Sequence, residues 1–87
     1  MSNENLEIKN FIIKWFEKKN NFKIDKKKLN LNYFDSQWLD SLDIINLVET
    51  LEKKYSISFN ENHFEDRRFS TINGLSLIII TLIDEKK

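Results

Sequence analysis

Ser41 is the residue whose type and setting most directly suggest chemistry. It stands between Asp40 and Leu42, where a polar stretch gives way to a stretch with periodic apolar residues. A hydroxyl at the start of a helix lies beside backbone N–H groups and the positive end of the helix dipole, a setting that favours a bound phosphate. Either Asp40 or Ser41 has a side chain able to cap such a helix. We therefore interpret Ser41 as an attachment point for a phosphate ester.

The residues that follow Ser41 predict the helix that positions it. Neither proline nor glycine occurs between Asp40 and Tyr55, so one helix of about four turns is expected from Ser41 to Tyr55. At 100° per residue, a narrow apolar stripe forms the side that should face the core. Its members are Ile44, Leu47, Val48, Leu51 and Tyr55.

The opposite face of this helix carries apolar residues among acids. Leu42 and Ile45 point away from the core stripe, and the first base after Ser41 is Lys53. An apolar spot ringed by carboxylates favours a docking surface for basic partners. We expect the docking residues to be Asp43, Ile45, Asn46, Glu49 and Glu52.

These features together resemble the acyl carrier protein family. The residues that carry the resemblance are Phe34-Asp35, Leu39-Asp40-Ser41-Leu42-Asp43, the helix through Leu47, Glu49, Leu51 and Glu52, and Tyr55-Ser56-Ile57-Ser58-Phe59. The resemblance implies a 4′-phosphopantetheine arm, covalently attached to Ser41 and derived from coenzyme A. It also implies two kinds of partner, a phosphopantetheinyl transferase and an acyl or aminoacyl ligase or transferase. The carrier itself would be no enzyme.

One downstream segment is similar to D-alanyl carrier proteins. It runs Phe64-Glu65-Asp66-Arg67-Arg68-Phe69-Ser70-Thr71. Trp38 also replaces the glycine typical of fatty-acid carriers. Two positions depart from the D-alanyl pattern: Ile72 stands where a proline is usual, and Asp43 where a glycine is common. An amino acid, a fatty acyl chain and a specialised acyl group therefore all stay open as cargo. The resemblance further implies that the region of Arg67 helps to receive partners.

Other chemistries fit the sequence less well. A serine hydrolase needs a base and an oxyanion hole around its nucleophile. His63 is the only histidine of the chain, and no nucleophile elbow surrounds Ser41. We expect His63 to lie at the surface or in a helix cap. Asp35, Asp40 and Asp43 lack the spacing and turn glycine of a calcium loop. Lysines 26–28 are expected to be a solvated run rather than a nucleic-acid site. The remaining alternative to a carrier is a helical interaction adaptor without the arm.

Composition limits the class of protein. With 87 residues, 40% of them hydrophobic, the chain supports one domain, residues 1–87, expected to be monomeric. The lack of cysteine excludes disulfides, and no basic n-region or apolar run opens the chain, so a cytoplasmic location is expected. The nearly apolar run 75–83 is less than half of the ~20 residues that span a bilayer.

Charge is unevenly distributed although it sums to zero. Residues 1–28 hold eight lysines against four acids, and the remainder is acidic to the same extent. We expect an all-α, four-helix bundle resembling the acyl carrier fold. Long helices are predicted over residues 3–19, from Ser41 to Tyr55, and from residue 72 to about 83 after a cap at Ser70 or Thr71. A short helix should lie within 62–69.

The loop at 20–39 is unusually long and should be pinned to the core. The residues expected to pin it are Phe22, Ile24, Leu29, Leu31 and Phe34. The Ile57–Phe59 segment alternates like a strand but has no partner strand, so it should be an extended linker with two anchors. Gly74 should weaken the last helix by about 0.5–1 kcal/mol relative to alanine.

Overall fold

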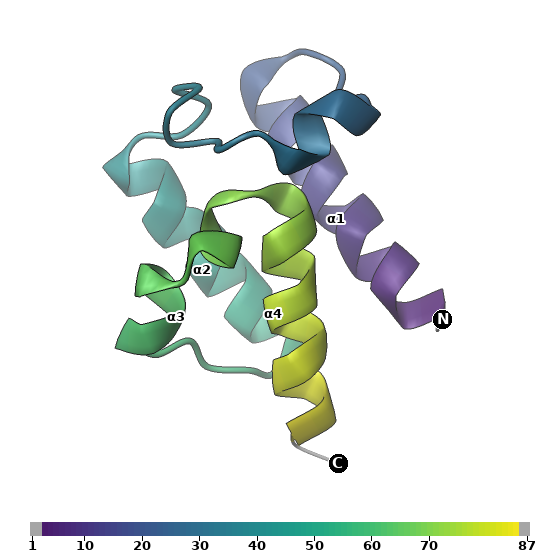
Figure 1. The fold of residues 1–87 in the computed structure, drawn as a ribbon, viewed down its shortest axis with the longest axis vertical. Coiled ribbons are helices and arrows are strands. Elements are labelled where there is room, and N and C mark those ends of the chain that lie inside the picture. The colour runs from purple at the N-terminus through teal and green to yellow at the C-terminus, as the bar shows by residue number, and fades with distance from the viewer. Residues whose placement is uncertain (1–2, 86–87) are drawn as a thin grey trace.

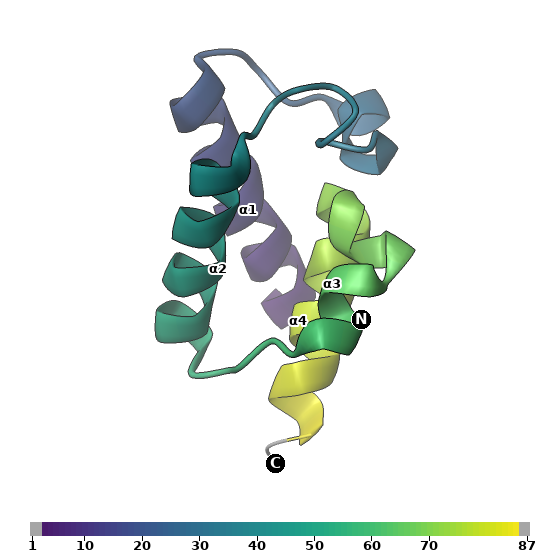
Figure 2. The same ribbon diagram turned by 90° about the vertical axis from the view of Figure 1, so that its left-hand side faces the viewer.

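The computed structural model describes residues 3–85, and within them the chain is an all-helical bundle with no strand. Four α-helices are present: α1 (Asn3–Asn20), α2 (Ser41–Tyr55), α3 (Glu61–Glu65) and α4 (Ile72–Glu85). Two 3₁₀ turns accompany them, η1 (Lys26–Asn30) and η2 (Arg67–Ser70). Figures 1 and 2 show the long α1–α2 connection crossing one end of the bundle, the end at which α2 begins. The three long helices and the short one are therefore confirmed.

The core is built from one face of each long helix. The helix α1 contributes Ile8, Ile12 and Phe16, and packs chiefly against α4. The predicted stripe of α2 faces inward, with Leu47 and Leu51 fully buried. Helix α4 contributes Ile72, Leu75, Ile78 and Ile79. The linker after α2 has the two expected anchors, a buried Ile57 and a half-buried Phe59. Within residues 3–85, no helix combines the length and apolar character needed to cross a bilayer.

The residue that anchors the long connection most firmly is not one of the five expected to pin it. Tyr33 is fully buried, its hydroxyl donates a hydrogen bond to the Phe69 carbonyl, and its backbone N–H donates to the Ser70 carbonyl over 2.9 Å. Two of the expected anchors are wrong, because Leu31 and Phe34 are 46% and 40% exposed. The others, Phe22, Ile24 and Leu29, are half-buried, the last within the unpredicted turn η1.

Helix starts in the second half of the chain are capped by side chains. The Thr71 hydroxyl accepts a hydrogen bond from the Gly74 N–H at 2.9 Å, so the cap of α4 is Thr71. His63 and Asn60 form a reciprocal capping box at α3, which confirms the expectation of a cap role for His63. Its Nδ1 accepts from the Asn60 N–H at 3.0 Å.

Gly74 has a structural role that helix propensity does not reveal. A Cβ atom at this position would lie 2.1 Å from the Arg68 carbonyl oxygen and 2.5 Å from the Arg68 Cα. Only glycine lets the first turn of α4 approach η2 this closely. The expected weakening relative to alanine is therefore wrong in sign, because the space that a methyl group would need is already filled by backbone.

Candidate functional site

Ser41 is the first residue of α2, and its side chain is exposed. The helix cap is Asp40, whose Oδ1 accepts a hydrogen bond from the Asp43 N–H at 2.9 Å. Asp43 reciprocates through Oδ2, which accepts from the Asp40 N–H at 3.1 Å. This capping box resolves the choice between Asp40 and Ser41 as the cap. No hydrogen bond joins the Ser41 hydroxyl to another residue of the described part of the chain.

Asp43 takes part in an ion pair that ties α1 to the start of α2. Its Oδ1 lies 2.7 Å from the Lys19 ammonium, and the residue is only 8% exposed. The hydrogen bond from Lys19 and that from the Asp40 N–H hold the pKa of Asp43 below its usual range, and the pKa of Lys19 is correspondingly raised. The carboxylate expected on the docking surface is thus engaged inside the chain. Its role is to brace the turn that carries Ser41.

A shallow apolar hollow lies directly beside Ser41. Its volume is about 560 Å³, and it is lined by Phe34, Leu39, Asp40, Ser41, Ile44 and Ile45. Phe34 reaches it from the long connection, where the Asn32 side chain accepts hydrogen bonds from the Phe34 and Asp35 N–H groups at 2.9 and 3.0 Å. The Asn32 turn was the available sequence signal for this loop, since asparagine commonly organises such turns. Sequence reasoning assigned Phe34 to the core instead.

The outer face of α2 is exposed as its periodicity predicts. Leu42 is 65% exposed and Ile45 54%, with Asn46 and Glu49 exposed beside them. Glu52 differs from the expectation, because it is half-buried and its Oε2 accepts a hydrogen bond from the Phe59 N–H at 2.9 Å. Of the acids expected on the docking surface, Glu49 therefore keeps an exposed carboxylate, whereas those of Asp43 and Glu52 hold the fold together.

Arg67 and Arg68 lie on η2, the turn that binds Tyr33. Arg67 is exposed, while Arg68 pairs with Asp66 at 2.8 Å. The side-chain hydrogen bond between Arg68 and Asp66 lowers the pKa of the carboxyl and raises that of the guanidinium. The structure thus leaves Arg67 accessible, and Arg67 is not among the residues that line the hollow beside Ser41.

The described residues do not assemble a metal site or a catalytic triad around Ser41. No group of three or more potential metal-binding histidine, cysteine, aspartate or glutamate residues occurs among them. His63 uses Nδ1 in the α3 capping box. What the site offers is an exposed hydroxyl at a capped helix start, beside an apolar hollow and an exposed apolar face.

Comparisons of the chain with protein-family models, with curated proteins and with solved structures found no match.

Proposed function

We propose that this protein is a carrier of the acyl carrier type, with a 4′-phosphopantetheine arm on Ser41. The observation that carries the proposal is the exposed Ser41 hydroxyl at the first position of α2. The helix is capped by Asp40 and Asp43, not by Ser41. A serine that is not needed as a cap is available for modification. The all-helical bundle with a short third helix and a long first connection is consistent with the carrier fold that the sequence resembles.

The attachment reaction would be performed by a separate phosphopantetheinyl transferase. The Ser41 oxygen attacks the phosphorus of coenzyme A that bears the pantetheine group and forms a new O–P bond. The pyrophosphate bond breaks, adenosine 3′,5′-bisphosphate leaves, and the serine proton passes to a base of the transferase. By resemblance, Asp40 lies near the Mg²⁺ ion of that enzyme. The phosphate would then sit at the N-terminus of α2, where exposed N–H groups and the helix dipole favour negative charge.

The loaded arm would present its thioester to successive enzymes. An ATP-using ligase or an acyltransferase attaches the acyl or aminoacyl group to the terminal thiol. The tether keeps the group at high effective concentration near any enzyme that recognises the helix. Leu42 and Ile45 on the outer face of α2, with Glu49, form the proposed docking surface. The apolar hollow beside Ser41 offers a surface on which the base of the arm can rest.

Mass spectrometry of the intact protein tests the proposal. Incubation with a promiscuous phosphopantetheinyl transferase and coenzyme A should add one arm to the wild type and none to Ser41→Ala. Ser36→Ala is the matched control, because Ser36 is an exposed serine of the same loop region and should leave modification unchanged. The Ser41→Ala protein should stay folded, since Asp40 provides the cap.

Two results would count against the carrier. Modification of Ser41→Ala would show that the attachment site is wrong. A wild-type protein that stays unmodified both with the transferase and in its native host would favour the adaptor, a helical protein that binds partners through α2 without an arm.

A further inference from the structure

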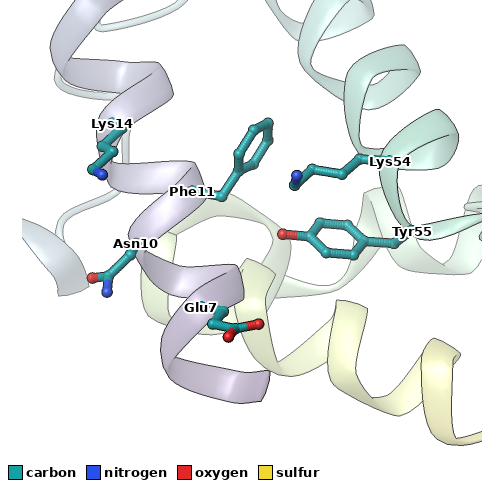
Figure 3. A pocket seen from close by; sticks show the side chains of 6 residues that line it. All are labelled: Glu7, Asn10, Phe11, Lys14, Lys54 and Tyr55. Atoms are coloured by element: carbon teal, nitrogen blue, oxygen red, sulfur yellow. The ribbon is translucent and has the colours of Figure 1, made fainter. Parts of the chain in front are cut away.

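Two further hollows lie along the seam between α1 and α2, and neither shares a lining residue with the hollow beside Ser41. The first has a volume of about 390 Å³ and is lined by Glu7, Asn10, Phe11, Lys14, Lys54 and Tyr55 (Figure 3). The second, of about 440 Å³, is lined by Trp15, Lys18, Lys19 and Asn46. They occupy successive stretches of the same two helices, and we call them together the lysine groove. The seam is open because α1 packs chiefly on α4 rather than on α2.

The floor of the lysine groove is aromatic. Phe11, Trp15 and Tyr55 are each half-buried. The rings of Phe11 and Tyr55 meet edge to face, with their centroids 6.2 Å apart. Figure 3 shows both side chains reaching into the gap between the helices. Burial, together with the negative charge of Glu7, raises the pKa of Tyr55. The groove therefore offers apolar contact area that is already held in place by packing.

The rim of the groove is positively charged. Lys14, Lys18 and Lys54 are exposed, and none of their ammonium groups pairs with a carboxylate in the described part of the chain. The Lys54 ammonium instead lies 4.6 Å from the centroid of the Phe11 ring. Glu7 is the one acid among the lining residues of the two hollows. Three of the eight lysines of residues 1–28, namely Lys14, Lys18 and the Asp43-paired Lys19, thus line the two hollows together with their aromatic side chains.

We propose that the lysine groove docks an acidic amphipathic helix of a partner protein. Carboxylates of such a helix would pair with the lysine rim, and its apolar side chains would cover the aromatic floor. The residues that line the two hollows lie about seven positions apart on α1 and eight to nine apart on α2, a spacing of ~10–13 Å, which matches residues i and i+7 or i+8 of a bound helix. The proposal does not depend on the arm, because Ser41 and the exposed Leu42 and Ile45 are not among the groove residues.

Two other partner classes fit the groove less well. Single-stranded nucleic acid binds by stacking bases on aromatic faces. The Phe11 ring is covered by Lys54 and contacted by Tyr55, and the groove contains no arginine. A membrane surface would require apolar side chains that protrude beyond the charged ones. Here the aromatic rings are half-buried between exposed lysines, an arrangement that suits an inserted side chain.

Fluorescence titration can locate binding in the groove. Trp38→Phe leaves Trp15 as the only tryptophan, so its emission reports on the floor of the second hollow. The probe is a synthetic helix of about 18 residues, or five turns, with leucine along one stripe and glutamate elsewhere. We expect saturable binding with a blue shift of the Trp15 emission. The same peptide with lysine in place of glutamate should not bind.

Matched charge-reversal variants distinguish binding in the groove from attraction by the overall charge of the protein. Lys14→Glu with Lys18→Glu should weaken binding of the glutamate peptide by about tenfold, equivalent to ~1.4 kcal/mol. Lys26→Glu with Lys27→Glu makes the same change in net charge on η1 and should alter the affinity by less than about twofold, because neither exposed lysine lines the groove and salt screens exposed charges that do not contact the peptide. The melting temperatures of both double variants serve as the check that each is folded.

Several outcomes would overturn the proposal. Equal losses in the two double variants would show that only net charge attracts the peptide. Absence of binding by the glutamate peptide would contradict the groove as a helix site. Binding of a single-stranded oligonucleotide or of anionic phospholipid vesicles that is abolished by the groove variant, without binding of the peptide, would show that the partner class is wrong. Failure of the Ser41 modification test would leave each of these results unaffected.

Discussion

Replacement of Gly74 by alanine should destabilise the fold, against the direction that helix propensity predicts. Alanine is a better helix former than glycine by about 0.5–1 kcal/mol in a helix interior. In this structure the added Cβ would lie 2.1 Å from the Arg68 carbonyl oxygen, whereas ordinary contact begins near 3.4 Å. The atom that it meets belongs to the backbone. Helix α4 and η2 must therefore move apart by about 1 Å, since no flexible side chain can yield.

The magnitude follows from two opposing effects. Overpacking of this kind costs about 1–3 kcal/mol and occasionally more. Displacing η2 also strains the hydrogen bonds that Tyr33 makes to Phe69 and Ser70, each worth about 1 kcal/mol. Subtracting the propensity gain leaves a net loss of about 2–3 kcal/mol for Gly74→Ala. For a domain of this size that lowers the melting temperature by roughly 8–24 °C.

Urea unfolding followed by circular dichroism measures the effect. Thr81→Ala is the control, because Thr81 is an exposed position of the same helix whose hydroxyl bonds only to the Leu77 carbonyl, at 3.0 Å. This variant should keep or slightly raise the stability, by up to about 0.5 kcal/mol. A Gly74→Ala protein as stable as the wild type, or more stable, would refute the close approach of α4 and η2.

The remaining predictions concern the site and its cargo. Ile45→Ala should slow transfer to a partner enzyme and hardly change the free energy of unfolding. Leu51→Ala, at a buried position, should instead lower the free energy of unfolding by about 2–5 kcal/mol. Equal losses of the two variants in urea unfolding would contradict the orientation of α2. Because the folded-state pKa of Asp43 is lowered, the stability that it contributes is present above its unfolded pKa of about 3.9 and is lost as the pH falls through the lower folded value. The difference in urea midpoint between wild type and Lys19→Met should therefore shrink as the pH falls from neutrality to below about 3, and a difference independent of pH would show that the ion pair adds nothing. A long acyl chain on the arm should raise the melting temperature little, because fully buried side chains already fill the bundle. Burial of the chain would instead stabilise the fold by ~0.8 kcal/mol per CH₂ group, and the large rise in melting temperature that follows would favour a fatty-acyl carrier.

Several local features of the chain followed from the sequence alone. The bounds of α2, its inward stripe and its exposed Leu42 and Ile45 are set by a period of 3.6 residues and by a polar cap, and neither depends on distant parts of the chain. The extended Ile57–Phe59 segment was predicted in the same way, and both of its expected anchors pack against the core. Exposure of Ser41 at a helix start was therefore predictable, while its role as an attachment site stays a prediction.

Tertiary contacts decided which of the polar residues near the site are free. Asp43 and Glu52 looked like docking acids, yet one pairs with Lys19 of α1 and the other accepts a hydrogen bond from the Phe59 N–H. Such partners are invisible to a pattern that considers one helix at a time. The choice between a surface carboxylate and an internal one depends on how neighbouring segments approach.

Contacts between distant segments also explain the other differences between the predicted and the observed structure. Tyr33, rather than Phe34, anchors the long connection because its hydroxyl reaches a carbonyl that lies far along the chain, at Phe69. Gly74 is required by the backbone of η2 and not by its own helix. The sequence determined the excess of lysine near the N-terminus, but only the open seam between α1 and α2 brings Lys14 and Lys18 into one groove with Lys54 and the aromatic side chains. Periodicity and caps act within a few residues, whereas clamps, close approaches and grooves are set by contacts between segments that meet only in the folded chain.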